Sequence, residues 1–183
     1  MSRIGKLPIA IPPGVTVDIK ENEVTVVGPK GKLGRRFNPD INIALKDNSV
    51  VVTRPDDARE HRALHGLTRS LLANMLTGVS SGFEKGLEMV GVGYRVEKDG
   101  ANIVLRCGFS HQVKVNPLSG VALSVEGNNK IKVTGIDKEV VGEMAAEIRA
   151  IRPPDAYKGK GIRYAGEQIK LKPGKAAKAV GSK

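Results

Sequence analysis

The sequence lacks several residue types that would give it a covalent framework or an aromatic core. Its 183 residues include no tryptophan, one cysteine and only 3% aromatic residues. A single cysteine excludes an intrachain disulfide. The core must therefore come from valine, isoleucine and leucine, and the short valine-rich runs favour β-strands.

Long apolar runs are also missing. No stretch approaches the roughly 18 apolar residues of a membrane span. The first residues, MSRIGKLPIAIPPG, lack the apolar block of a secretory signal. Together with the lone cysteine, these absences predict a soluble protein of a reducing compartment with no membrane partner.

Anionic residues are too few to balance the cations. The chain has 30 Lys and Arg against 19 Asp and Glu, which gives a formal net charge of +11. The net charge is +4 over residues 1–82, zero over 83–151 and +7 over 152–183. A charge excess kept only for solubility would not gather at one end, so we expect a polyanionic partner, with nucleic acid as the first candidate.

Two segments of the sequence resemble each other. NSVVVTRPD at 48–56 aligns with NKIKVTGID at 129–137, with Asn, Val, Thr and Asp in common. INIALK at 41–46 and VALSVE at 121–126 precede these segments, and a helical pattern follows each copy. We therefore expect an internal duplication of a strand–turn–strand–helix unit.

The helix of the first copy is predicted to begin in the stretch DDARE. Asp57 can cap it, and Glu60 lies three residues later, as in a capping box. Gly78 is a suitable C-terminal stop. Apolar residues recur at spacings of three and four, which predicts one buried face. That face comprises Leu64, Leu67, Leu71 and Met75.

The helix of the second copy is predicted to begin after Asp137, an acceptable cap. It should end before Pro153 and Pro154, because the residue before a proline avoids the α region. Its predicted buried face comprises Val141, Met144, Ile148 and Ile151.

The remaining segments alternate between apolar and polar residues, as half-buried strands do. Asp99-Gly100 predicts a hairpin turn between two such runs. Lys46-Asp47-Asn48 and Gly127-Asn128-Asn129 predict further turns.

These elements predict an α+β fold class. The chain should form two similar domains that arise from the internal duplication, each an antiparallel sheet with one packed helix. We expect an N-terminal repeat at residues 1–82 and a C-terminal repeat with the binding loop at 83–175, with a polar hinge at 80–82. Residues 176–183 should form a flexible basic tail.

No motif for catalysis or a cofactor stands out. None of the Gly-Lys pairs has the spacing of a phosphate-binding loop. The GVG at 91–93 favours sheet glycines, and Glu143 with Glu147 favours a solvated helix face over an acid/base pair. We therefore expect no enzyme, no cofactor and no small-molecule substrate.

Two pairs of residues could bear chemistry and are disfavoured. His61 and His65 lie four apart on a helix, but HRALH lacks the glutamate of a zinc protease and no third ligand is evident. We favour ordinary, partly exposed histidines and no metal. Cys107 and His111 have no orienting Asp or Asn nearby, so a nucleophile is disfavoured. The hypothesis that the chain is a small enzyme depends on this pair alone.

The stretch PPDAYKGKGIRYAGE at 153–167 carries the strongest binding signal. It combines three cations, three glycines and two tyrosines with one large aliphatic residue, Ile162, so we expect it to bury little. The glycines would let the backbone approach a partner and offer N–H groups to phosphate oxygens. The cations would reach phosphates, and the tyrosines would stack on unpaired bases or bond to a sugar. The predicted RNA-binding residues are Pro154, Tyr157, Lys158, Gly159, Lys160, Gly161, Arg163, Tyr164, Lys170, Lys172 and Lys175.

RNA is favoured over DNA because neither helix has an exposed face rich in base-reading side chains. Extended basic loops with glycine suit irregular RNA shapes. Three alternatives stay open from the residues alone: an unspecific basic tail, a free-standing RNA-binding regulator or RNA chaperone, and the small enzyme.

PDAYKGKGIRY resembles, nearly residue for residue, the signature of the bacterial large-subunit ribosomal protein six family. SRIGKLPIAIPPGVTV at the N-terminus, GFSH at 108–111 and the doubled domain also match. The resemblance implies a structural constituent of the large ribosomal subunit that binds 23S rRNA, near the stalk base and the site where translation factors dock. It implies neighbouring large-subunit proteins as further partners, and a cytoplasmic location in the ribosome.

Overall fold

The computed structural model describes residues 4–46 and 48–174. The chain divides into two compact units. The first comprises residues up to Phe83 together with Ile136–Lys138, and the second comprises the remainder. Neither helix of the described residues combines the length and the hydropathy of a membrane span.

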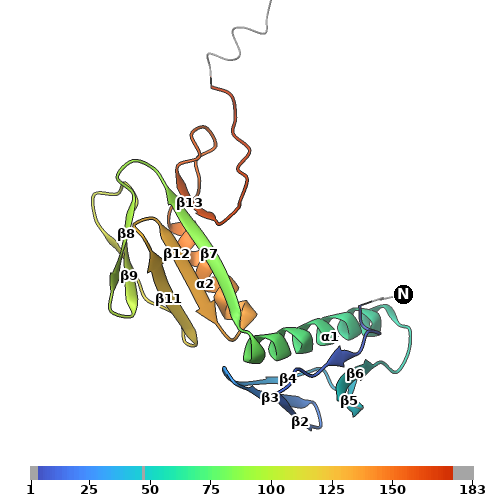
Figure 1. The fold of residues 1–183 in the computed structure, drawn as a ribbon. Coiled ribbons are helices and arrows are strands. Elements are labelled where there is room, and N and C mark those ends of the chain that lie inside the picture. Colours follow the sequence, from blue (N-terminus) through green and yellow to red (C-terminus); the bar gives the residue numbers. More distant parts are fainter. Residues whose placement is uncertain (1–3, 47, 175–183) are drawn as a thin grey trace, which may run out of the picture. The chain divides into compact units, whose positions relative to one another are not determined.

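The first unit contains two three-stranded sheets and one helix (Figure 1). One sheet has the strand order β1-β6-β5 and the other β2-β3-β4, and the paired strands are antiparallel. The helix α1 contacts strands of both sheets. The elements are β1 (Ile9–Ala10), β2 (Thr16–Lys20), β3 (Glu23–Gly28), β4 (Gly31–Arg36), β5 (Asn42–Lys46), β6 (Ser49–Thr53) and α1 (Arg59–Ser80).

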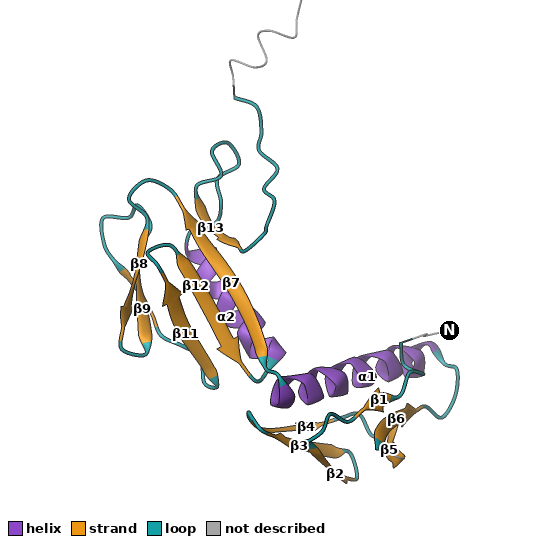
Figure 2. Cartoon of the chain, in the orientation of Figure 1, coloured by secondary structure: helices purple, strands orange, loops and turns teal. Residues whose placement is uncertain are grey.

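The second unit repeats this plan with a larger sheet. A four-stranded sheet has the order β11-β12-β7-β13, and a three-stranded sheet has the order β10-β9-β8. Figure 2 shows α2 lying along one face of the four-stranded sheet. The elements are β7 (Phe83–Val90), β8 (Arg95–Asp99), β9 (Asn102–Arg106), β10 (Val113–Val115), β11 (Val121–Glu126), β12 (Lys130–Gly135), α2 (Lys138–Ile151) and β13 (Gly161–Tyr164).

The predicted fold class is confirmed. The two segments that resemble each other form the hairpins β5–β6 and β11–β12, and each hairpin precedes the helix of its unit. Each unit has two antiparallel sheets where one was expected. The hairpin turn at Asp99-Gly100 joins β8 to β9, and Gly100 adopts φ +62°. The turn at 127–129 joins β11 to β12, whereas Asp47 lies outside the described residues.

The helix α2 follows the prediction closely. It begins at Lys138, directly after Asp137, and ends at Ile151, before the two prolines. Val141, Met144 and Ile148 are each at most 1% exposed. The fourth predicted member of this face, Ile151, is only half-buried.

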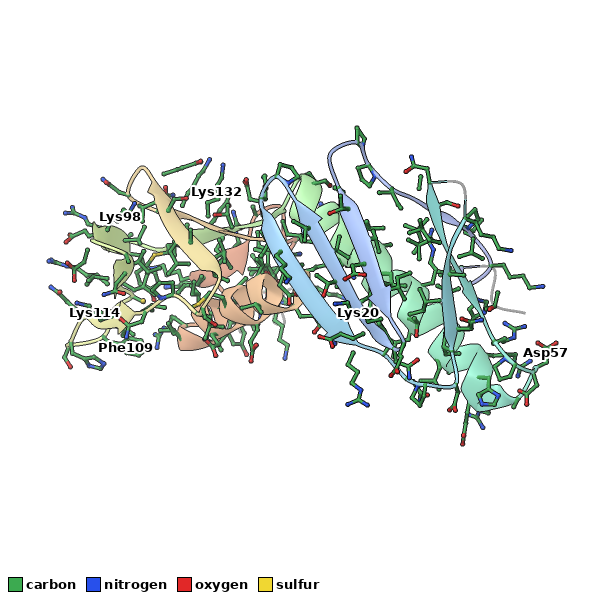
Figure 3. All side chains as sticks on the ribbon, turned by 90° about the horizontal axis from the view of Figure 1, so that it is seen from below. Lys20, Asp57, Lys98, Phe109, Lys114 and Lys132 are labelled. Atoms are coloured by element: carbon green, nitrogen blue, oxygen red, sulfur yellow. The ribbon has the colours of Figure 1, made fainter. Side chains whose placement is uncertain are left out.

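The start of α1 differs from the prediction. The helix begins at Arg59 with Ala58 as N-cap, and no side chain caps it. Asp57 accepts a hydrogen bond of 2.9 Å from Arg54 Nε. Because that carboxylate is held by the guanidinium, the Asp57–Glu60 capping box does not form. Figure 3 labels Asp57, which lies just before the helix.

The C-terminal end of α1 also differs. Gly78 is a buried residue inside the helix, which continues to Ser80. The backbone N–H groups of Ser81 and Gly82 both donate to the carbonyl of Thr77, and Gly82 adopts φ +77°. The left-handed residue that closes the helix is therefore Gly82.

The buried face of α1 is rotated from the predicted one. Leu67 is 54% exposed, while Leu72 is 1% exposed. Leu64 and Leu71 are only partly buried, and Met75 is the one predicted member inside the core. The buried residues of the helix are His65, Thr68, Leu72, Met75, Leu76, Gly78 and Val79.

Candidate nucleic-acid interface

All predicted binding residues except Lys175 lie on one segment, which we call the C-terminal loop, residues 152–174. It leaves α2 at the two prolines and passes through the short strand β13. That strand pairs antiparallel with β7, with Gly161 opposite Val90 and Ile162 opposite Met89. Ile162 is 0% exposed. The segment therefore buries Ile162 and is anchored in the sheet, contrary to our expectation.

A turn built on Asp155 shapes the first part of the loop. The Asp155 carboxylate accepts hydrogen bonds from the backbone N–H groups of Lys158, at 2.9 Å, and Tyr157, at 3.3 Å. These hydrogen bonds lower the pKa of Asp155, and the bond from the Lys158 N–H has the larger effect. The Asp155 N–H also donates to the carbonyl of Lys160, at 2.9 Å. Our sequence reasoning gave Asp155 no role, although an aspartate before turn residues often forms such a turn.

The two central glycines serve the loop itself. The Gly159 N–H donates to the Asp155 carbonyl at 2.9 Å, so it does not offer itself to a phosphate. A Cβ on Gly161 would lie 2.6 Å from the Pro153 carbonyl oxygen and 2.7 Å from Pro154 Cα. The close approach that Gly161 permits is therefore to its own chain, and the Gly159 N–H is used within the loop.

Arg163 and Tyr164 lie in β13 and already have protein partners. Arg163 Nη2 donates to the Glu88 carboxylate at 3.1 Å. The Tyr164 ring is half-buried, with Lys85 Nζ 5.6 Å and the Arg149 guanidinium 5.5 Å from its centroid. Neither side chain is as available to a ligand as the sequence suggested.

The far end of β13 is tied to α2. Arg149 donates to both carboxylate oxygens of Glu167, at 2.6 and 3.1 Å, and the Tyr164 N–H donates to the same carboxylate at 2.9 Å. This hydrogen bonding raises the pKa of Arg149 and lowers that of Glu167. The pair was not visible in the sequence, because nothing in its pattern joins residues 149 and 167.

The lysines of the loop remain open to solvent. Lys158, Lys160, Lys170 and Lys172 are exposed, and none has an ion-pair partner among residues 4–46 and 48–174. The Tyr157 side chain is 59% exposed. The Lys172 N–H donates to the Ala156 carbonyl at 2.8 Å, which brings the last part of the loop beside the Asp155 turn. Lys175 lies outside the described residues.

A shallow hollow of about 350 Å³ adjoins these lysines. Lys158, Gly159 and Arg163 contribute to its lining. Arg163 Nε is buried and has no hydrogen-bond partner in the described part of the chain. Glu167, Ile169 and Leu171 also line the hollow, so it brings an exposed lysine together with a carboxylate and apolar side chains.

The two helix histidines are structural. His65 is 3% exposed, and its Nε2 lies 2.9 Å from the Val52 carbonyl oxygen, so it is not the partly exposed residue we expected. His61 Nδ1 contacts the Asp56 carboxylate, and this hydrogen bond raises the pKa of His61. No group of three possible metal ligands occurs in the residues that the structure describes.

Cys107 and His111 do not form a nucleophile pair. Cys107 is 0% exposed, whereas His111 is exposed and stacks on Phe109. Burial raises the pKa of the Cys107 thiol. The thiolate is the reactive form, so a raised pKa and a closed environment both lower its reactivity.

We therefore expect the folded protein at pH 8 to react with a disulfide reagent such as 5,5′-dithiobis(2-nitrobenzoate) at least about a hundredfold more slowly than the unfolded chain, because the thiol must first become exposed. The rise in absorbance of the released thiolate measures this rate with and without urea. Equal rates would show that Cys107 is accessible in the native state.

The fold and this loop define the class of the protein: a basic chain of two repeated α+β units. The model of the family described as ribosomal protein L6 matches residues 11–82 and 90–165, one segment in each half. The chain belongs to the ribosomal protein L6 family, a family of ribosomal proteins and not of enzymes. The resemblance seen in the sequence is thereby confirmed.

Curated relatives match along nearly their whole length. The large ribosomal subunit protein uL6 of Geobacillus stearothermophilus is 60% identical over 97% of this chain and 100% of its own. The protein of the same name from Moorella thermoacetica is 56% identical over 100% of both chains. That from Dehalococcoides mccartyi strain 195 is 57% identical over 96% of this chain and 97% of its own.

Proposed function

We propose that this chain is a structural constituent of the large ribosomal subunit in the cytoplasm and binds 23S rRNA through the C-terminal loop. The observation that carries the proposal is the set of exposed lysines on a loop with a fixed backbone. Pairing with β7, the Asp155 turn and the Gly161–Pro153 contact hold that backbone in place. A preorganised loop loses little conformational freedom when it meets an RNA backbone.

The residues of the loop divide into two groups in this proposal. Lys158, Lys160, Lys170 and Lys172 would neutralise phosphates, and Tyr157 would stack on a base or bond to a sugar. The remaining predicted residues would contribute chiefly by shaping the loop: Pro154, Gly159, Gly161, Arg163 and Tyr164. Lys175 would extend the cationic surface. The family resemblance supports a place near the stalk base and the translation-factor site, beside other large-subunit proteins.

The proposal predicts how binding to purified 23S rRNA depends on salt. Changing Lys158, Lys160 and Lys172 together to Gln should flatten the plot of log affinity against log salt by roughly two to three units, because each phosphate contact contributes about 0.7–0.9. Arg163 is left unchanged because Glu88 already pairs with it. Filter binding over a range of salt concentrations measures the slope.

The matched control removes the same formal charge elsewhere. Lys32, Arg36 and Lys98 are exposed and have no ion-pair partner among the described residues. Changing these three to Gln should leave the slope within about one unit of the original. If the two triple variants flatten the slope equally, the attraction is unspecific and the loop is not the binding site.

A free-standing RNA-binding regulator would use the same lysines, and sedimentation separates the two functions. A constituent of the subunit should co-sediment with large subunits in one copy each at moderate salt. A chain found mainly in the light fractions would favour the regulator.

A further inference from the structure

The turn between β9 and β10 carries an exposed stack of planar side chains. The Phe109 and His111 rings lie with their centroids 5.6 Å apart and their planes inclined by 13°. The Arg152 guanidinium lies over the Phe109 ring, 5.1 Å from its centroid. We call these three residues the stacking platform. Phe109 is 39% exposed, and Figure 3 shows it at the periphery of the second unit.

The backbone of a neighbouring turn supports the platform. Gly108 adopts φ +77°, and the position of its missing Cβ lies 3.3 Å from the Tyr94 ring. The same ring lies 3.0 Å from the Cβ position of Gly91. Tyr94 therefore packs the β7–β8 turn against the β9–β10 turn. Val92, within the β7–β8 turn, is 90% exposed, which is unusual for an aliphatic side chain in a packed turn.

The β7–β8 turn, which Tyr94 packs against the β9–β10 turn, lies at the same end of the second unit as the C-terminal loop (Figure 1). Arg152 is the first residue of that loop, and its carbonyl accepts a hydrogen bond of 2.8 Å from the Ile162 N–H. The β7–β8 turn begins at Gly91, next to Val90, which pairs with Gly161. Arg152 therefore connects the platform to the C-terminal loop, which carries the exposed lysines.

We propose that the stacking platform is a second RNA contact, at which an unpaired base of the bound RNA stacks on the solvent-exposed part of the Phe109–His111 pair. This inference rests on the proposed function, because it assigns a further contact to the same RNA. Contacts to phosphates position the RNA backbone without reading its bases. A stack on a protein ring, by contrast, binds only a base that is unpaired.

The chemistry of the platform favours a nucleobase over the apolar side chain of a protein. A guanidinium and an imidazole flank the one hydrocarbon ring, and such planar polar groups stack well on bases. The exposed apolar part of the platform is small, since Phe109 is its one hydrocarbon ring and is 39% exposed. His111 has no carboxylate partner in the described part of the chain, so nothing orients it for proton transfer.

The absence of tryptophan from the sequence makes a direct test possible. Phe109→Trp introduces a single tryptophan, whose emission can be excited apart from that of the three tyrosines, and preserves a stacking ring. A base stacked on that indole should quench most of its emission as 23S rRNA is added, with the same midpoint as filter binding. A perfectly paired RNA duplex should leave the emission unchanged. Leu45→Trp provides the control, because Leu45 is 52% exposed on a strand of the other unit and should not be quenched.

Affinity measurements separate stacking from apolar packing. Phe109→Ala should weaken binding to 23S rRNA by about 5- to 150-fold without changing the salt slope, which is the range for one lost base stack. Phe109→Leu should lower the affinity for 23S rRNA as much as Phe109→Ala does, while Phe109→Trp should bind as tightly as the unchanged chain. Thermal unfolding of each variant verifies that the fold is retained.

Two outcomes would overturn the inference. One is unchanged emission from the Phe109→Trp variant at RNA concentrations that saturate binding. The other is full affinity of Phe109→Leu, which would indicate an apolar protein neighbour at this surface. Either result can occur while the triple lysine variant still flattens the salt slope. The inference about the platform can therefore be rejected while the proposed function of the C-terminal loop is kept. Conversely, an unchanged slope with strong quenching would reject the loop and keep the platform.

Discussion

Replacing Leu72 by alanine should lower the free energy of unfolding by about 2–5 kcal/mol. The side chain is 1% exposed and belongs to the core between α1 and the two sheets of the first unit. Its removal leaves a cavity that rigid neighbours cannot fill. Leu67→Ala, one turn and a third away on the same helix, should change that energy by only about 0.5 kcal/mol, since Leu67 is 54% exposed.

Urea unfolding followed by circular dichroism measures both energies under the same conditions. The comparison removes helix propensity from the result, because both changes replace leucine by alanine within one helix. A cost for Leu67→Ala that equals the cost for Leu72→Ala would mean that the leucine stripe of the sequence is the buried face after all.

The two helices show why one buried face was predictable and the other was not. In α2 the apolar residues form a single stripe, and the structure buries the first three of its four predicted members. In α1 two stripes compete. The buried one includes His65 and Thr68, which a count of apolar residues passes over, and His65 is satisfied by the Val52 carbonyl. The pattern of leucines therefore selected the wrong side.

The ends of α1 were misplaced for a related reason. Asp57 has the residue type of a cap, but Arg54 competes for its carboxylate. Gly78 has the residue type of a stop, but it stays helical and is closely packed. Local propensity names residues that could end a helix, and tertiary contacts decide which of them do.

The binding surface was predictable in composition and not in geometry. The gathering of cations after residue 152 follows from the sequence alone. The pairing of β13 with β7 joins residues more than seventy positions apart, and the Arg149–Glu167 pair leaves no local pattern. The stack of Phe109 on His111 was equally hidden, because the motif GFSH drew attention to the histidine as a possible partner of Cys107.

Changing Gly161 to valine should abolish RNA binding by the loop although it removes no charge. Gly161 adopts φ +148°, and its missing Cβ would lie 2.6 Å from the Pro153 carbonyl oxygen. A branched side chain must therefore push the backbone at Pro153 and Pro154 away, and the Asp155 turn moves with it. Lys158 and Lys160 then lose their fixed positions. We expect the affinity for 23S rRNA to fall at least as far as in the triple lysine variant, with a similarly flattened salt slope.

Gly174→Val provides the control, because a Cβ at Gly174 meets nothing within 4 Å. That variant should bind like the unchanged chain. Adding Gly161→Val to the triple lysine variant should lower the affinity little further. The lysines that the valine would displace are already replaced by glutamine, and two changes that remove the same contacts do not add. Fully additive losses would show that Gly161→Val acts elsewhere, by unfolding the second unit. In that case the shape of the loop would not be what positions its lysines.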